Sequence, residues 1–309
     1  MLVLGEVLTS LLPTSAALPA DAAERLLTLT TGAAASRSDR PISFVVSPER
    51  LVGVDCQVPA GRHGGVRGIG TVATRALLTG GHVLQSSART VAVSSRHTRR
   101  LPWSYYLARP GTLQIVGRYR EDDLAEAVLE RHPKPPLLNL ASIAEHTTRR
   151  VLADVRVAAK VPLASHRTTL RWAAFLDAGD EMLGFSVESG HHRAIRLSTR
   201  DTDPGDVAAL CQDLALHDWL LTTLTGILDR APLAWPKESA AVDRIQPAVD
   251  HLLHLWMPGA RLGERARLHW ERIERLAGFE RQWRASVQRI RDHLALSTLR
   301  ELSRLGASR

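Results

Sequence analysis

Lysine, cysteine and aromatic residues are scarce in this chain of 309 residues, and each scarcity limits what the protein can be. Among the 40 basic residues only Lys134, Lys160 and Lys237 are lysines, so the formal net charge of +8 rests almost entirely on arginine. Arginine in place of lysine, together with abundant alanine and leucine, is typical of proteins encoded by GC-rich genomes. The net charge alone therefore does not indicate a nucleic-acid-binding protein.

Cysteines and long apolar runs are equally limited. The two cysteines, Cys56 and Cys211, are far apart and neither belongs to a CxxC pair, which argues against a disulfide scaffold and a cysteine-rich zinc site. No uncharged apolar stretch reaches the length of about 18 residues that a membrane span needs. The apolar N-terminus contains Glu6 and no basic residue before Arg25, so it lacks the basic region of a signal peptide. We expect a reduced, cytoplasmic protein without a membrane partner.

The N-terminal half carries the clearest fold signal. Two strand-like runs, 67–78 and 83–93, are separated by Thr79-Gly80-Gly81-His82. Successive glycines reach the positive φ angles of a tight turn without strain, so this pattern predicts an antiparallel hairpin. Further strands are predicted at 1–12, 41–46, 50–59 and 113–119, and short helices at 21–30 and 121–132. Residues 1–135 are thus expected to form a mainly antiparallel α+β domain that ends at the prolines Pro133, Pro135 and Pro136.

A second α+β domain is predicted for residues 136–309, with its helical part over about 204–305. Strand-like runs at 168–176, 181–188 and 193–198 predict a three-stranded meander whose strands run up, down and up. Helices are predicted at 142–155, from 204 to about 228, at 242–256, and in one long segment at 262–305. Asp203 and Pro204 have the residue types that favour a helix start. The expected architecture is a meander covered by long helices.

A glycine-rich segment invites a cofactor interpretation that its context does not support. Gly68-Ile69-Gly70-Thr71-Val72-Ala73 matches the G-x-G-x-x-A form of the dinucleotide fingerprint. That motif binds a pyrophosphate only where a strand ends just before it and a helix starts within it. Here the segment is better explained as part of the hairpin, so we expect no bound cofactor. Helical pairs such as Asp213 with His217, and His251 with His254, lack a third metal ligand and are interpreted as surface or interface residues.

Acidic residues in two loops form the candidate metal site. If the three C-terminal strands run up, down and up, the turn after residue 176 and the loop after residue 198 lie at the same end of the sheet. Carboxylates gathered there can bind a divalent cation or support acid–base chemistry. The alternative is a set of turn and helix-cap residues. The candidate ligands are Asp177, Asp180, Asp201 and Asp203.

Arginines on the last helical segment form the candidate partner surface. Residues 261–309 contain 12 arginines and six acidic residues, which places a net charge of +6 in this segment and +2 in the rest of the chain. Such a surface suits an anionic partner, either nucleic acid or an acidic protein. The alternative is a solvated face held by pairs such as Glu280 with Arg284. The candidate surface residues are Arg265, Arg272, Arg284 and Arg291.

Several segments of the chain resemble an uncharacterised family of conserved actinobacterial proteins. They read GEVLTSLLP at 5–13, VGVDC at 52–56, VRGIGTVATRALLTGGHVLQSS at 66–87 and LPWSYYLARPG at 101–111. Members of that family are similar over most of their length and are encoded beside a variant P-loop protein. The resemblance implies a cytoplasmic location and work within a small multi-protein system. It supplies no catalytic residues.

These observations predict a non-enzymatic interaction component of a bacterial cytoplasmic multi-protein system. Its partner is expected to be another protein, with a P-loop protein encoded nearby as one candidate. One alternative is a divalent-cation-binding protein or enzyme that uses the acidic loops near Asp177 and Asp201. The other is a nucleic-acid-binding protein that uses the arginine-rich C-terminal helix.

Overall fold

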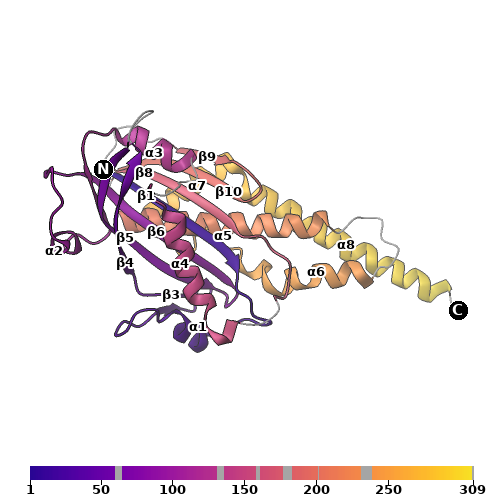
Figure 1. The fold of residues 1–309 in the computed structure, drawn as a ribbon. Helices are drawn as coiled ribbons and strands as arrows, with labels where there is room; N and C mark the ends of the chain where they lie inside the picture. Colours follow the sequence, from indigo (N-terminus) through magenta and orange to yellow (C-terminus); the bar gives the residue numbers. More distant parts are fainter. Residues whose placement is uncertain are drawn as a thin grey trace.

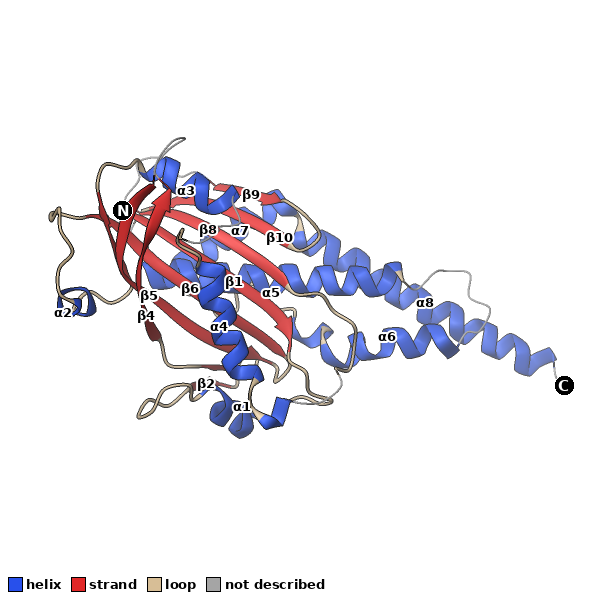
Figure 2. Ribbon diagram, in the orientation of Figure 1, coloured by secondary structure: helices blue, strands red, loops and turns tan. Residues whose placement is uncertain are grey.

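A computed structural model describes residues 1–59, 65–130, 136–157, 161–176, 183–200, 202–230 and 239–307. A single mixed sheet of ten strands forms the centre, and helices cover both of its faces (Figure 2). The α+β class predicted from the sequence is confirmed. The predicted linker prolines Pro133 and Pro135, and the acidic residues Asp177, Asp180 and Asp201, lie outside the described residues.

Strands and helices are mixed along the chain up to residue 199, and every described element after it is helical. The strands are β1 (Leu2–Leu11), β2 (Ser36–Ser38), β3 (Phe44–Val46), β4 (Arg50–Pro59), β5 (Gly65–Thr79), β6 (Val83–Ser94), β7 (Thr112–Val116), β8 (Thr168–Leu176), β9 (Leu183–Val187) and β10 (His192–Thr199). The helices are α1 (Ala20–Leu27), α2 (Trp103–Leu107), α3 (Glu121–Glu130), α4 (Leu140–Leu152), α5 (Pro204–Asp229), α6 (Ser239–His251), α7 (Glu264–Ala277) and α8 (Phe279–Ala307). Short 3₁₀ turns lie at Val155–Val157 and Leu253–Leu255.

Strand β1 joins the two halves of the chain. The sheet order is β2-β3-β5-β7-β6-β1-β8-β10-β9, with β4 also paired to β5. β1 is antiparallel to β6 on one side and to β8 on the other. Strands from both sides of the expected boundary between residues 135 and 136 therefore belong to one continuous sheet.

The predicted glycine hairpin is present. β5 and β6 are antiparallel and meet at the pair Thr79 and Val83. Gly80 and Gly81 have φ angles of 59° and 67°, which is the left-handed region that glycine adopts without strain. The His82 amide donates to the Thr79 carbonyl at 3.1 Å and closes the turn.

The second glycine pair of this segment lies inside β5, not in a loop. β5 and β6 separate beyond the hairpin, and β7 enters between them, antiparallel to β5 and parallel to β6. A Cβ atom on Gly70 would lie 2.0 Å from the Thr112 carbonyl oxygen. Gly70 is thus required by the close approach of β7, and the segment has the geometry of a strand and not of a nucleotide-binding turn.

The C-terminal strands do not form the predicted meander. β10 is parallel to β8 and antiparallel to β9, so it lies between them. Their directions are up, down and up as expected, but their order in the sheet is β8-β10-β9. Burial accounts for this order: β10 is almost entirely buried and needs a neighbour on each side, whereas the five-residue β9 is mostly exposed and occupies the edge.

Helices α5 to α8 cover one face of the sheet, while α1, α3 and α4 cover the other (Figure 1). The larger core lies under α5 and includes residues from β1, β8 and β10. α5 is buried around most of its circumference because the sheet covers one side and the later helices cover the other. Two smaller cores lie on the opposite face.

The predicted helix at 262–305 is two helices. α7 ends at Gly278, which has a φ angle of 67°, and α8 begins at the next residue. A left-handed glycine is a common helix end because no side chain opposes that backbone conformation. The break lets Trp270 of α7 and both Phe279 and Trp283 of α8 reach the same core.

Candidate functional site

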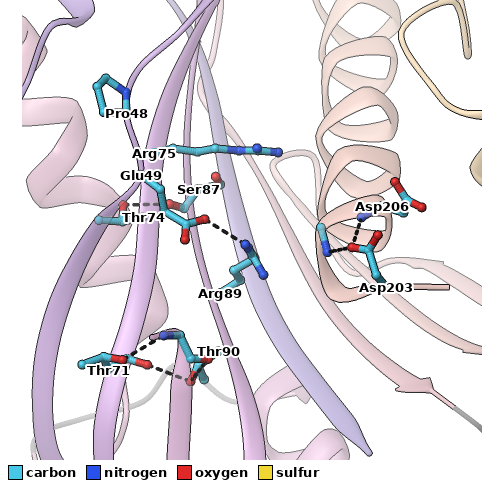
Figure 3. Close-up of polar contacts among 12 residues, drawn as sticks. Pro48, Glu49, Thr71, Thr74, Arg75, Ser87, Arg89, Thr90, Asp203 and Asp206 are labelled. Atoms are coloured by element: carbon cyan, nitrogen blue, oxygen red, sulfur yellow. Dashed lines mark hydrogen bonds and ion pairs between the residues drawn. The ribbon is translucent and has the colours of Figure 1, made fainter. Parts of the chain in front are cut away.

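Of the four predicted metal ligands, the described residues include only Asp203, and its role is structural. Its Oδ1 accepts hydrogen bonds from the amides of Gly205 and Asp206 at 2.5 and 3.0 Å and caps the start of α5 (Figure 3). β8 and β10 are parallel, so their C-terminal ends lie at the same end of the sheet, as the metal-site prediction requires. Within the described ranges, no group of three or more histidine, cysteine or acidic residues is placed to hold a metal ion.

The predicted partner arginines of α7 lie beside exposed leucines. Arg265 and Arg272 are exposed, and the spacing of Arg265, Leu268, Arg272 and Leu276 places all four on one side of the helix. Leu268 and Leu276 are large apolar side chains with exposed fractions of 56% and 62%. The outer side of α7 therefore combines guanidinium groups with uncovered apolar area.

The outer side of α8 also combines exposed arginines with exposed leucines. Arg284 and Arg291 are exposed, and Arg284 forms an ion pair with Glu280 at 2.8 Å. Toward the C-terminal end, Leu299 and Leu302 are 61% and 60% exposed, and Leu296 is also exposed. This end of α8 extends beyond the sheet (Figure 1). We call the exposed residues Arg265, Leu268, Arg272, Leu276, Arg284, Arg291, Leu296, Leu299 and Leu302 the α7–α8 surface.

An aromatic cluster fixes the inner sides of the two helices. The rings of Trp256 and Trp283 stack with centroids 4.2 Å apart, and Trp270 stacks on Phe279 at 5.9 Å. The indole N–H of Trp256 donates to Glu280 Oε2 at 2.9 Å. These contacts hold α7 and α8 in one orientation and so determine which residues remain on the α7–α8 surface.

A buried polar network anchors the segment before α7 to α5. Asp213 accepts from the Gly259 amide at 2.8 Å and from the guanidinium of Arg261, which also donates to Thr79 at 3.3 Å. His217 Nδ1 lies 2.7 Å from the Asp213 carbonyl oxygen, and burial lowers the pKa of this histidine. The helical pair Asp213 and His217 is therefore part of a structural network and not of a surface.

A second polar layer lies between the sheet and α5. Arg75 donates to the neutral side chain of Gln212 at 2.5 Å. Beside Arg75, the more exposed Glu49 pairs with Arg89 at 2.8 Å (Figure 3). Gln212 in turn donates to Ser87 at 2.7 Å. Burial and the neighbouring arginines lower the pKa of Arg75. The hydrogen bonds of this layer fix the position of α5 on the sheet. Apolar packing alone would not define that position.

Glu6 is the most perturbed carboxyl on the opposite face. It is buried, and its Oε1 lies 3.6 Å from Arg171 Nε. Burial raises the pKa of Glu6 to about 7, although Arg171 opposes that shift. A small cavity of about 20 Å³ adjoins Glu6 and is lined mainly by apolar residues from the end of β4, from α3, and from the start of α4 with the residues just before it. That volume is close to the space of one water molecule, so the cavity is too small for a substrate.

The thiols of Cys56 and Cys211 are both unreactive. Burial raises the pKa of the Cys56 thiol to about 11 and that of Cys211 well above its usual value, so neither thiol is activated. His82 at the hairpin turn meets the His251 ring edge to face at 4.6 Å. Burial, His251 and His254 lower the pKa of His82 to about 4. This contact docks the hairpin turn on the end of α6.

Several of these residues could not be found from the sequence. The pairs Glu6 with Arg171 and Asp218 with Arg193 come from strands and helices far apart in the chain, and no spacing links them. The exposed leucines of α8 carried a signal, because Leu296, Leu299 and Leu302 recur in a segment otherwise rich in charge. Interpreting the helix only through its apolar stripe and its arginines missed them.

A scan against protein-family models, a search of curated proteins and a search of solved structures each found no match to this chain. Among the described helices, none combines the length and the apolar character needed to cross a lipid bilayer.

Proposed function

We propose that this protein is a non-enzymatic component of a bacterial cytoplasmic multi-protein system and that it binds a protein partner through the α7–α8 surface. The observation that carries the proposal is the set of five exposed leucines on α7 and α8. Exposed apolar side chains of this size are typical of interaction sites where they lie close together. Leu296, Leu299 and Leu302 recur every third residue at the end of α8, so they lie within two helical turns of one another. The aromatic packing holds α7 and the first turns of α8 in place.

The composition of the surface favours a protein partner with acidic and apolar groups. Arginine is enriched at protein interfaces because its guanidinium can pair with carboxylates and its stem still covers apolar area. Leucine side chains supply the apolar contact that a purely electrostatic surface lacks. The resemblance described above makes a P-loop protein encoded nearby the first candidate partner.

A nucleic-acid partner is the second candidate, and the surface favours it less. Proteins that bind single strands stack bases on exposed aromatic rings. Here Trp270 and Trp283, the tryptophans of α7 and α8, are buried in the core. Phosphate contacts also gain nothing from exposed leucines, which a protein partner would cover.

Co-purification with the adjacent P-loop protein tests the proposal. The full chain, produced together with that protein in the source bacterium, is expected to form a complex that light scattering detects after size-exclusion chromatography. Replacing Leu299 and Leu302 by glutamine keeps a good helix former at both positions but removes the apolar contact. We expect affinity to fall by about tenfold or more, as for the loss of well-buried interface residues.

The matched control is Leu107→Gln on α2. Leu107 is 56% exposed. Its helix α2 lies at the other end of the molecule from the tip of α8 (Figure 1). This variant should bind like the original chain. A chain that stays a solitary monomer both in native extracts and with the P-loop protein would contradict the proposal. A complex that nuclease treatment dissolves would point to nucleic acid instead.

A further inference from the structure

Strand β9 leaves one edge of the sheet open. It pairs with β10 on one side and has no neighbouring strand on the other within the described residues. The Glu188 amide donates to the His192 carbonyl at 3.0 Å, which fixes the alternation of the ladder. By that alternation the backbone groups of residues 184 and 186 point toward β10. Those of Leu183, Phe185 and Val187 therefore point away from the sheet, where another strand could bind them.

The opposite edge of the sheet is protected in a way that β9 is not. β2 is only three residues long, and its central residue Arg37 is tied to Asp21 and Asp39 by hydrogen bonds of about 3 Å. A short strand with charged side chains discourages pairing with another chain. β9 reads LGFSV and contains neither charge nor proline. Val187 is also 61% exposed, so the edge presents an apolar side chain that a bound partner could cover.

An open trough runs along this edge between β9 and α3. Its volume is about 470 Å³, and its lining includes the small residues Gly184, Ser186 and Ala194 on the floor. The walls include Glu126 and Glu130 of α3 and Glu188 just after β9. Small residues on the floor leave room for the side chains of an added strand, because Gly184 and Ser186 of β9 line this side.

The charge of the trough is acidic. Arg196, the one basic residue among the described lining residues, is bonded to Asp122 at 2.5 Å and lies over the Phe175 ring at 4.7 Å. The carboxylates of Glu126, Glu130 and Glu188 are exposed and form no ion pair with another described residue. Glu126 and Glu130 are four positions apart on α3, so they lie roughly 6 Å from each other. Alternate side chains on one face of a strand are spaced by about 7 Å, which matches that separation.

We propose that the free edge of β9 binds an extended segment of a partner protein as an added strand, and that this segment carries basic residues at alternate positions. Its backbone would bond to the outward groups of Leu183, Phe185 and Val187. Its basic side chains would lie in the trough against Glu126 and Glu130. The side chains between them would fall on the other face, where Phe185 packs on Phe279 of α8 at 5.5 Å. They are therefore expected to be apolar. Strand addition of this kind takes affinity from the backbone and specificity from alternate side chains.

A fluorescein-labelled peptide of sequence RVRVRVR tests this site on the full chain by fluorescence anisotropy. We expect saturable binding that weakens as the salt concentration rises from about 50 to about 300 mM, because the contacts are partly between exposed charges. The peptide EVEVEVE and an RVRVRVR peptide N-methylated at its third and fourth residues should bind at least about tenfold more weakly. The first reverses the charge, whereas the second keeps every charge and loses a ladder donor in either strand direction, because successive N–H groups of a strand point to opposite sides. Equal binding of the N-methylated peptide would overturn strand addition, as would the absence of saturable binding by RVRVRVR at low salt.

Two pairs of variants separate the backbone from the charge contribution. Val187→Pro removes one outward N–H without touching the bonds to β10, whereas Val187→Thr keeps that N–H. We expect the proline variant to lose about tenfold or more in affinity and the threonine variant to stay within about twofold. Glu126→Gln combined with Glu130→Gln should lower affinity by about tenfold and flatten the salt dependence, even if Val187→Pro does not fold. Unchanged affinity in both the proline variant and the glutamine variant would overturn the proposal.

The proposed β9 site is separate from the α7–α8 surface. The variant with glutamine at positions 299 and 302 should bind the RVRVRVR peptide as the original chain does. Loss of peptide binding in that variant would contradict a separate site at β9. Retained peptide binding beside a failed P-loop complex would leave the β9 site in place and reject only the function proposed above.

Discussion

Buried ionisable residues on both faces of the sheet are the unusual feature of this molecule at the scale of single residues. Glu6 faces Arg171 on the side of α3 and α4, and Arg193 pairs with Asp218 of α5 at 2.9 Å on the other side. Buried pairs add little net stability, because the cost of removing two charges from water offsets their attraction. They do penalise alternative strand registers, since a shift by one residue would leave each charge buried without its partner.

The stability of the protein should fall as the pH rises, because Glu6 is buried. Its pKa is raised from 4.5 to about 7, so the folded protein holds a proton at pH values where the unfolded chain has released it. The contribution is fully present below pH 4.5 and is lost as the pH rises through about 7. Over that window the unfolding free energy should fall by about 3 kcal/mol more in the original chain than in Glu6→Gln.

Urea unfolding at a series of pH values between 5 and 8 measures this difference. Other groups, such as His82 with its pKa lowered to about 4, titrate in both proteins and cancel in the comparison. Glu6→Gln also leaves Arg171 without its carboxylate, so only the change with pH is informative, not the absolute stability. Parallel curves for the two proteins would show that Glu6 is ionised in the folded state throughout this range.

At the scale of elements, the entry of β7 between β5 and β6 depends on Gly70. An alanine there would place its Cβ 2.0 Å from the Thr112 carbonyl oxygen and 2.9 Å from the Leu113 Cα. Both are backbone atoms, so the clash cannot be relieved by turning a side chain. We expect Gly70→Ala to lower the unfolding free energy by about 2–3 kcal/mol, as forced overpacking does. Gly190→Ala is the matched control, because a Cβ at Gly190 meets no atom within 4 Å. Equal urea midpoints for the two variants would refute this account of Gly70.

Local chemistry explains which elements could be predicted from the sequence. The hairpin was predictable because Gly80 and Gly81 select a tight turn by themselves. The start of α5 was predictable because Asp203 and Pro204 act within a single helical turn. The order β8-β10-β9 was not, since it depends on which strand is buried by helices distant in the chain. The break at Gly278 was missed because an isolated glycine within a periodic pattern reads equally well as a tolerated helical residue.

The candidate site shows the same limit. That the arginines of α7 and α8 are exposed could be predicted, because charge and helical spacing are local properties. The sequence could not show that Val187 and its neighbours form a free sheet edge, because that follows from the order of strands across the whole sheet. It also could not bring Glu126 and Glu130 beside β9. Both proposed binding surfaces are therefore consequences of tertiary structure.

The sheet makes the two halves of the chain interdependent at the scale of the whole molecule. β1 pairs with both β6 and β8, and the core under α5 contains Val3 and Val7 of β1 together with residues of α5 to α8. The hairpin turn is also held from the far half, because Arg261 donates to Thr79 and Leu255 covers Gly80. A cut at the expected boundary would expose one whole face of β1 and the full length of one sheet edge.

Neither 1–135 nor 136–309 should therefore fold when produced alone. We expect each fragment to lack a cooperative thermal transition and to show poor dispersion in its amide NMR spectrum, because its exposed edge and apolar face have no cover. Mixing the two fragments should restore the transition, since β1 and β8 would again form their antiparallel pair. The intact chain, measured in parallel, should unfold in one step whether near-UV or far-UV circular dichroism is followed. A well-dispersed spectrum from either isolated fragment, or two separate transitions in the intact chain, would mean that the halves are independent domains despite their shared sheet.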